Sequence, residues 1–249
     1  MTLPVGVIGA AGRMGATVCR AVSAADGMDL VAEVDLDTPS GLDALTEAGA
    51  AIAVDFTVAG VAVDNARWCA AHGLHCVIGT TGIGPDEQAV LDEAFPAEGP
   101  LGCIVAPNFA IGAVLMMHFA AVAAPYFETA EIIELHHDGK IDAPSGTAMA
   151  TAAGMEAASA QWAADPTTVV VAAGARGGLS AGGGVRIHSV RMRGMVAHQE
   201  VILGTTGQTL TIRHDSMDRE SFMPGVLAAV RAVSSRPGLT IGLDRVLGL

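Results

Sequence analysis

The sequence predicts an α/β fold in which a parallel sheet comes first and an α+β region follows. In the N-terminal part, short apolar runs alternate with Ala-rich helical stretches, which is typical of parallel strands with helices on both faces of the sheet. Further along, Val-, Ile- and Thr-rich runs follow one another without helices between them. Such a succession favours a mixed or antiparallel sheet in a second domain.

The first 35 residues are expected to form a strand, a glycine turn, a helix and a second strand. Val5–Ile8 is a short buried run, Gly9–Gly15 is the turn, and Ala16–Ala25 has helical composition. Leu30–Val34 then predicts a strand that ends at Asp35. Three further apolar runs continue the alternation, at Ala51–Phe56, His75–Ile78 and Cys103–Ala106.

After Asn108 the pattern changes. A long apolar helix is expected at Ile111–Ala124, a strand at Ala130–His136 and a helix from Ser145 to Ala160. The successive strands of the second sheet are expected at Val169–Val171, Val185–Arg191, Gln199–Leu203 and Leu210–His214.

Two features follow from local composition in the last third of the chain. The glycine-rich stretch Gly174–Gly184 predicts a mobile loop. A final helix is expected at Ser221–Val233, with Asp218 as its N-terminal cap.

Composition excludes several classes of protein. The formal net charge of -13 argues against a nucleic-acid partner, which needs a basic surface. The apolar stretch Ala110–Ala124 is too short to span a bilayer, and no basic segment of a signal peptide precedes the first strand. The cysteines are dispersed, without a CxxC pair, so reduced thiols in the cytoplasm are expected: Cys19, Cys69, Cys76 and Cys103.

The turn Gly9-Ala10-Ala11-Gly12-Arg13-Met14-Gly15 is a candidate dinucleotide site. Glycines between a strand and a helix bring backbone N–H groups and the helix N-terminus against a pyrophosphate. The spacing GxxGxxG by itself fits an ordinary turn equally well, but Asp35 ends the next strand, where a carboxylate can accept from ribose hydroxyls. Arg13 can either meet phosphate oxygens or be a solvated helix-start residue.

Two more segments follow strands that we expect in the same sheet. Gly79-Thr80-Thr81-Gly82 comes after one strand, and Ala106-Pro107-Asn108-Phe109 comes after the next. The carboxyl edge of such a sheet binds ligands, so either segment is a candidate contact for a nicotinamide ring, although each can be merely a turn.

The stretch from His136 to Ala148, HHDGKIDAPSGTA, combines three chemical features. It carries a titratable imidazole, the ammonium group of Lys140, and a helix start at which Ser145 suits the N-cap. The backbone N–H groups of Gly146 and Thr147 are then expected to point into the loop and form an anion site. Paired histidines can also bind a metal, but no third ligand stands at a characteristic spacing, so no metal is expected.

At this point the sequence resembles the dihydrodipicolinate reductase family. The stretch ELHHDGKIDAPSGTA looks like the family's signature, and GAAGRMG, DFT, GTTG and APNFAIGA match family blocks in the same order. The C-terminal AHQEV and LTIRHDSMDR segments look like the actinobacterial branch. The resemblance implies a Rossmann-like dinucleotide-binding domain at residues 1–106 and 216–249. It also implies an inserted domain at residues 107–215 for substrate binding and oligomerisation.

The resemblance also implies roles for individual residues. His136 would be the acid/base, Lys140 the proton donor, and His137, Gly146 and Thr147 would hold a substrate carboxylate. The residues implied for NADH and/or NADPH are Gly9, Ala10, Ala11, Gly12, Arg13, Met14, Asp35, Gly79, Thr80, Thr81, Ala106, Pro107, Asn108 and Phe109. One position departs from the family loop, because Gly139 stands where a third histidine is usual.

The implied activity is NAD(P)H-dependent reduction of 4-hydroxy-tetrahydrodipicolinate to tetrahydrodipicolinate in lysine and diaminopimelate biosynthesis, by a cytoplasmic homotetramer. The partner expected is a small dicarboxylate substrate, with no nucleic acid and no membrane. Two alternatives are a reductase or amino-acid dehydrogenase for another anionic imine or carbonyl, and a nucleotide-sensing protein without turnover. The second would have no use for both His136 and Lys140.

Overall fold

The computed structural model describes residues 2–249, which divide into two compact units. One unit comprises the chain up to Ile111 together with Arg219–Leu249, and the other is Gly112–Asp218. The C-terminal segment therefore returns to the unit in which the chain begins. Each unit is built around its own sheet.

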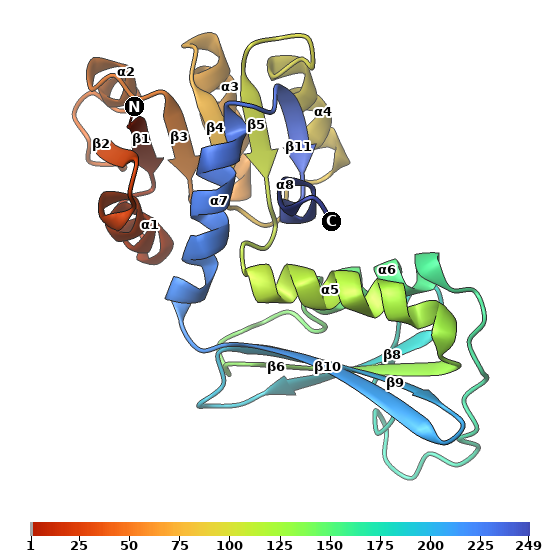
Figure 1. Cartoon of the computed structure of the whole chain (residues 1–249). Coiled ribbons are helices and arrows are strands. Elements are labelled where there is room, and N and C mark those ends of the chain that lie inside the picture. Colours follow the sequence, from red (N-terminus) through yellow and green to blue (C-terminus); the bar gives the residue numbers. More distant parts are fainter. Residues whose placement is uncertain (1) are drawn as a thin grey trace. The chain divides into compact units, whose positions relative to one another are not determined.

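The first unit contains a six-stranded sheet in the order β11-β5-β4-β3-β1-β2, in which every pair of neighbours is parallel (Figure 1). Its central strands are short apolar runs buried along their length, which is typical of parallel strands covered on both faces. The strands are β1 (Leu3–Ile8), β2 (Met28–Val34), β3 (Ile52–Asp55), β4 (His75–Ile78), β5 (Gly102–Val105) and β11 (Gly238–Ile241).

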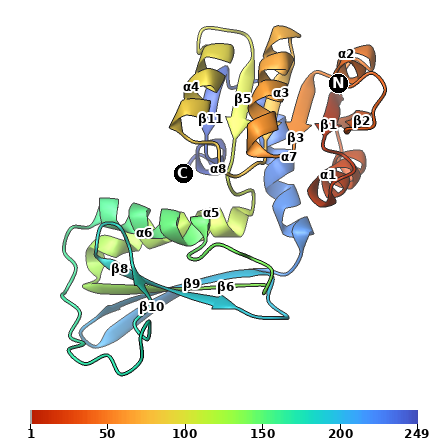
Figure 2. The same cartoon turned by 180° about the vertical axis from the view of Figure 1, so that it is seen from behind.

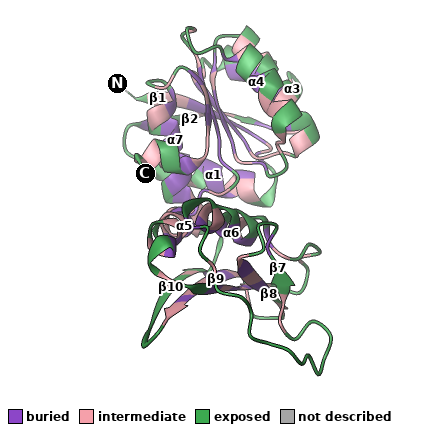
Figure 3. Cartoon of the chain, turned by 90° about the vertical axis from the view of Figure 1, so that its right-hand side faces the viewer, coloured by how far each residue is buried: buried purple, intermediate pink, exposed green. Residues whose placement is uncertain are grey.

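Helices cover both faces of this sheet. Helix α1 (Arg13–Ala24) contacts α7 (Met223–Val233) on one face, and α3 (Ala59–Ala71) contacts α4 (Pro85–Ala94) on the other (Figure 2). The buried residues lie along the strands and on the helix sides that face them (Figure 3). The shorter elements are α2 (Asp43–Glu47), the 3-10 turn η2 (Arg219–Phe222) and α8 (Leu243–Leu247).

The second unit contains a five-stranded mixed sheet in the order β10-β9-β6-β8-β7. Strand β6 is parallel to β8, and the other pairs are antiparallel. Helices α5 and α6 lie on the same face of this sheet (Figures 1 and 2). Its elements are α5 (Ile111–Ala123), the 3-10 turn η1 (Ala124–Tyr126), β6 (Thr129–His136), α6 (Gly146–Ala158), β7 (Gly178–Leu179), β8 (Val185–Arg191), β9 (Ala197–Thr205) and β10 (Gln208–Ser216).

The two faces of β6 have different environments. Ala130, Ile132 and Glu134 are buried, whereas the residues between them are half-buried, because successive side chains of a strand point to opposite faces. Ala130 and Ile132 join the apolar core of this unit with residues of α5 and α6. Glu134 is the one charged member of the buried row, and its partners are described below.

The predicted fold class is confirmed, with two local corrections. Val169–Val171 is not a strand: no strand pairs with it, and its side chains are mostly exposed, so β-branched composition alone did not suffice. Asp218 is not the cap of the last helix, because η2 intervenes and Phe222 precedes α7.

Two strands were not predicted. Strand β11 completes the parallel sheet beside β5, and β7 lies within the glycine-rich stretch Gly174–Gly184, where it pairs with β8. Both strands are short. Strand β11 pairs with a strand that is distant in sequence, and β7 lies in a glycine-rich stretch, so local composition indicates neither of them. Among the described residues, no helix combines the length and the hydropathy needed to cross a membrane.

Candidate active site

The glycine turn after β1 is tightly closed. Gly9 has φ of 79°, a conformation that favours glycine. A Cβ at Gly15 would lie 2.0 Å from the carbonyl oxygen of Gly9, so no larger residue fits there. Helix α1 begins at Arg13, earlier than the predicted Ala16, so the last part of the turn is already its first helical turn. Gly12 is the N-cap, and because glycine has no side chain, no side chain caps this end of the helix. The helix start is therefore open to an anion.

Asp35 links the turn to the end of β2. One carboxylate oxygen, Oδ2, accepts from the backbone N–H of Ala11 at 2.8 Å. The other, Oδ1, accepts from the backbone N–H of Leu36 at 2.8 Å. Each oxygen keeps a second lone pair with which it can accept from a hydroxyl group.

A cavity of about 250 Å³ lies beside this carboxylate. Most of its lining is apolar, and Asp35 is the only charged residue in it. These properties suit an adenosine group, with the flat base among apolar side chains and the ribose against the acid. The lining residues are Ile8, Gly9, Val34, Asp35, Leu36, Gly41, Leu42, Thr57, Val61 and Asn65. Sequence reasoning missed several of them, since β2, α2 and α3 bring them together only in the folded unit.

A buried carboxylate shapes the loop after β3. Asp55 is wholly buried and accepts from Thr57 through its backbone N–H at 2.8 Å and its hydroxyl at 2.6 Å, and from Asn65 Nδ2 at 2.7 Å. The carbonyl of Thr57 in turn accepts from the hydroxyl of Thr80 at 3.3 Å. The DFT block and the segment after β4 are therefore connected at one edge of the sheet.

The two segments expected near the nicotinamide do follow β4 and β5 at that edge. Ala106 and Phe109 are buried, and the Phe109 ring packs on Phe56 with centroids 5.8 Å apart. Thr81 and Pro107 are exposed. The buried members shape the edge of the sheet, and the exposed ones are the accessible candidates for cofactor contact.

In the second unit, the loop after β6 joins His136 to helix α6. A turn closes at its start, where the N–H of Lys140 donates to the carbonyl of His137 at 3.2 Å. At its end Ser145 is the N-cap of α6, and its hydroxyl accepts from the N–H of Ala148 at 3.1 Å, which confirms the predicted cap. A Cβ added at Gly146 would meet nothing within 4 Å, so the first turn of α6 opens into space that a ligand can enter.

His136 bonds to a buried acid. Its Nδ1 lies 2.5 Å from Oε2 of Glu134, which is 0% exposed. Burial lowers the pKa of His136, the carboxylate of Glu134 raises it, and the charges of Lys140 and Arg191 lower it, so that the pKa ends below its usual value. Because an ionised carboxylate only accepts, Nδ1 carries the proton and Nε2 keeps a lone pair that can bind or return a proton.

Lys140 forms an ion pair within the same loop. Its Nζ lies 2.8 Å from each carboxylate oxygen of Asp142. This hydrogen bond is the main reason that the pKa of Asp142 is below its usual value. The positive charge expected beside the anion site is therefore partly neutralised, which the sequence did not indicate.

His137 follows the last residue of β6 and is exposed. Its ring lies beside Gly139, where an added Cβ would be 3.3 Å from Nδ1 of His137. The family's usual histidine at this position would therefore require His137 to move by a few tenths of an ångström. The glycine leaves room for His137 to stay where it is.

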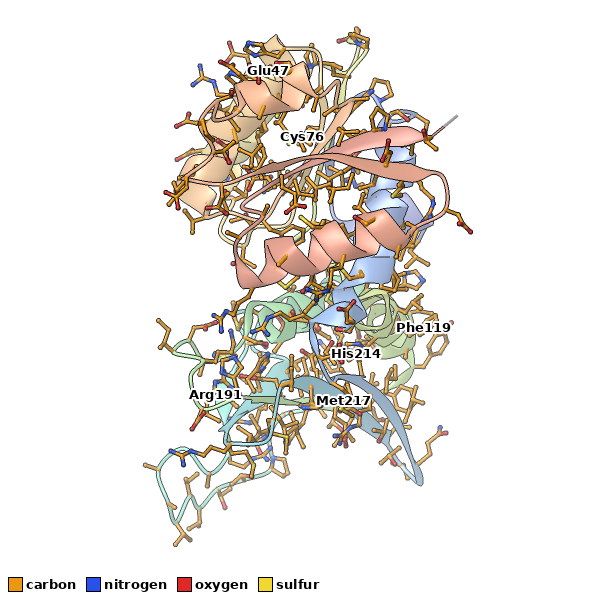
Figure 4. The ribbon with its side chains drawn as sticks, turned by 90° about the vertical axis from the view of Figure 1, so that its left-hand side faces the viewer. Glu47, Cys76, Phe119, Arg191, His214 and Met217 are labelled. Carbon is orange, nitrogen blue, oxygen red and sulfur yellow. The ribbon has the colours of Figure 1, made fainter. Side chains whose placement is uncertain are left out.

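Arg191 is the residue of this region that sequence reasoning missed. It ends β8, in register with His136 on β6. Nη1 and Nη2 donate to Oε2 and Oε1 of Glu134, both at 2.8 Å, and Nη2 also donates to the carbonyl of Asp142 at 2.6 Å. Figure 4 shows Arg191 among the side chains of this loop region. It lies 57 residues from Glu134 in sequence, so no local pattern could have revealed it.

Comparison with known proteins identifies the family. The model of the dihydrodipicolinate reductase N-terminus matches residues 3–109, and that of the C-terminus matches residues 112–247. The chain belongs to the dihydrodipicolinate reductase family. Two relatives named 4-hydroxy-tetrahydrodipicolinate reductase, from Cutibacterium acnes and Thermobifida fusca, are 51% and 53% identical to it. The alignments cover 99% of this chain with 99% and 100% of those relatives.

A solved member of the dihydrodipicolinate reductase family has the same fold. The enzyme from Paenisporosarcina sp. TG-14, described with dipicolinate bound, superposes with a TM-score of 0.86 at 36% identity. The superposition covers 98% of this chain and 99% of that one. The match therefore includes both the glycine turn of the first unit and the His136 loop of the second.

Proposed function

We propose that this chain reduces 4-hydroxy-tetrahydrodipicolinate to tetrahydrodipicolinate with a nicotinamide cofactor, in lysine and diaminopimelate biosynthesis. Full-length relatives carry the name of this activity. The observation that carries the proposal for this chain is the loop from His136 to Gly146, which combines an imidazole, an ammonium group and an open, capped helix start.

A nicotinamide cofactor fits the first unit. The pyrophosphate would lie against the turn Gly9–Met14, the adenine ribose against Asp35, and the adenine in the adjoining cavity. The exposed parts of Gly79–Thr81 and Ala106–Phe109 would face the nicotinamide. When bound, the cofactor supplies the hydride, and the protein supplies orientation and a proton. Both NADH and NADPH are proposed as cofactors, and the preference is tested below.

A dicarboxylate substrate fits the second unit. One carboxylate would accept from the backbone at Gly146 and Thr147, with His137 beside it. Lys140 would donate a proton to the ring as it is reduced, and His136 would act as acid/base while water leaves. A positioned proton donor is typically worth about 10²–10⁴-fold in rate.

We also propose a homotetramer in the cytoplasm, as the family resemblance implies. Light scattering coupled to gel filtration measures the mass directly, against 25.1 kDa for one chain. A monomeric mass across the micromolar range would contradict this part of the proposal.

The decisive experiment is a coupled assay. The purified chain is mixed with NADH or NADPH and with 4-hydroxy-tetrahydrodipicolinate made in situ, and cofactor oxidation is followed by absorbance. Pyridine-2,6-dicarboxylate should inhibit competitively with substrate, whereas pyridine without carboxylates should not.

Two outcomes would contradict the proposal. Turnover of other anionic imines or carbonyls at equal rate would favour a reductase or amino-acid dehydrogenase of different specificity. Cofactor binding without turnover of any of them would favour a nucleotide-sensing protein.

A further inference from the structure

Glu134 is the one charged side chain in the buried row of β6, and it is 0% exposed. It stands two residues before His136, so both side chains lie on the same face of the strand. An ionised carboxylate in such a place is costly unless other groups bond to it. The bonds it receives therefore indicate what holds it there.

Groups from three segments saturate this carboxylate. Oε2 accepts from Nη1 of Arg191 at 2.8 Å and from Nδ1 of His136 at 2.5 Å. Oε1 accepts from Nη2 of Arg191 at 2.8 Å and from the backbone N–H of Ser145 at 3.2 Å. The bidentate geometry with arginine is the strongest form of such a pair. One buried group thus contacts the acid/base candidate, strand β8 and the cap of α6.

We infer that Glu134 is a positioning residue for the proposed reduction: it orients the imidazole of His136 and, with Arg191, holds both ends of the substrate loop. The inference rests on the proposed function. Arg191 also bonds to the middle of this loop, because the same Nη2 that bonds to Glu134 donates to the carbonyl of Asp142. The loop between His136 and Ser145 is therefore attached to Glu134 at each end and to Arg191 within it.

Glu134 and Arg191 also affect the pKa of His136 through their charges. The charged groups near the ring are Glu134 on its own strand, Arg191 on β8, and Lys140 with Asp142 in the loop. Glu134 favours the protonated imidazole, whereas Arg191 and Lys140 disfavour it. Burial raises the pKa of Glu134, but the hydrogen bonds from Arg191 and His136 outweigh it and hold the pKa below its usual value, so the carboxylate stays ionised at neutral pH.

The first test is Glu134→Gln, which keeps the shape and removes the charge. Removing the partner that orients a metal-bound histidine typically lowers activity or metal affinity about 10–100-fold. We expect a decrease of similar size, about 10–100-fold, in kcat/KM for Glu134→Gln. The pKa of His136, followed by NMR of the ring protons, should move further down, because the group that raises it is gone. The acidic limb of the pH–rate profile should move in the same direction, and NADH affinity should not change.

Glu131→Gln is the matched control. Glu131 lies on the same strand, and it also bonds to an arginine and a histidine, Arg176 at 2.6 Å and His188 at 2.7 Å. Its side chain is on the opposite face of β6, away from the His136 loop. The control removes an equal charge from a similar cluster, so it should leave kcat/KM and the His136 titration near their wild-type values.

A double variant separates positioning from stability. Glu134→Gln alone leaves the guanidinium of Arg191 without its counter-ion, and the protein could lose stability for that reason. Glu134→Gln combined with Arg191→Met removes both charges, and such neutral replacements are often tolerated. If Glu134 positions His136, the double variant stays folded yet remains slow. The pKa of His136 should then lie above its value in Glu134→Gln, because Arg191 lowers it, but below its wild-type value, because Glu134 has the larger effect.

Two results would overturn the inference. One is a Glu134→Gln protein in which the pKa of His136 is the same as in wild type, or an enzyme in which kcat/KM and the acidic limb are unchanged. The other is a double variant that regains full activity along with stability. The His136 titration needs no substrate, so it tests the inference even if the wild type fails to reduce the proposed substrate, which would refute only the proposed function.

Discussion

The carboxylate of Asp35 accepts a hydrogen bond from the backbone N–H of Ala11 at 2.8 Å. This bond ties the end of β2 to the middle of the glycine turn, across 24 residues of sequence. The same carboxylate borders the apolar cavity in which adenosine is proposed to bind. A single side chain thus serves both the shape of the turn and the proposed contact with ribose.

Asp35→Asn should weaken NADH binding about 5- to 30-fold, because it removes roughly 1–2 kcal/mol of charge-assisted hydrogen bonding. Titration of nucleotide fluorescence measures the Kd. Asp37→Asn is the control, since it removes an equal charge from an exposed residue outside the cavity lining. Equal losses in both variants would mean that general charge, and not the position of Asp35, matters.

The wild type should use NADH at least as well as NADPH, because the carboxylate of Asp35 would repel a 2′-phosphate. Leu36 follows it and is 99% exposed at the rim of the cavity, so a change there should not disturb the core. Leu36→Arg should raise kcat/KM for NADPH relative to NADH by supplying a charged partner for the phosphate. Strong preference for NADPH in the wild type would contradict this interpretation of Asp35.

His136→Ala and Lys140→Ala should each lower kcat by about 10²–10⁴-fold, because each removes a proposed proton-transfer group. The Kd for NADH should not change, because neither residue belongs to the unit that holds the glycine turn. Single-turnover kinetics and nucleotide titration measure the two effects separately. Near-normal turnover in either variant would remove that residue from the mechanism.

Asp142→Asn should lower KM for the substrate about 2- to 5-fold, because it frees Lys140 from a partly exposed ion pair of modest strength. Asp138→Asn is the matched control: it lies in the same loop but pairs with the exposed Arg193. Steady-state kinetics at saturating NADH compares the variants. A rise in KM for Asp142→Asn would indicate that Asp142 holds Lys140 in its working position instead of competing for it.

The second unit should lose stability in acid. Hydrogen bonds hold the pKa values of Glu131 and Glu134 below their usual value against the effect of burial, and bonds from Arg213 and His198 do so for Asp215. The folded state therefore binds these protons only at lower pH than the unfolded chain does. The stability they contribute is complete above the ordinary carboxyl range, about pH 4–4.5, and is lost as pH falls through and below it.

Urea unfolding at pH 7 and pH 3.5 measures this loss. The chain has two tryptophans, and Trp162 packs against the core of the second unit, so its fluorescence in a Trp68→Phe variant reports on that unit. The urea midpoint should be lower at pH 3.5. An unchanged midpoint would show that these ion pairs contribute nothing to stability.

Local patterns were enough for much of the fold. The turn from Gly9 to Gly15 and the cap at Ser145 depend on residues within a few positions of one another, so their chemistry is visible in the sequence. The strands at His75–Ile78 and Val185–Arg191 have the predicted bounds. The helix after the turn was expected from Ala16 because glycine has low helix propensity, but it begins at Arg13. Gly15 lies in its first turn because only glycine fits so close to the carbonyl oxygen of Gly9.

The sequence alone determined the fold class, the family and the loop that carries His136 and Lys140, because periodicity, turn residues and capping act over short distances along the chain. Only the tertiary structure decided that Val169–Val171 has no strand partner, that β11 completes the first sheet, and that Arg191 neutralises Glu134. The register between β6 and β8 brings Arg191 beside His136. Pairing between strands far apart in sequence is set by the packing of the whole unit, which no local pattern records.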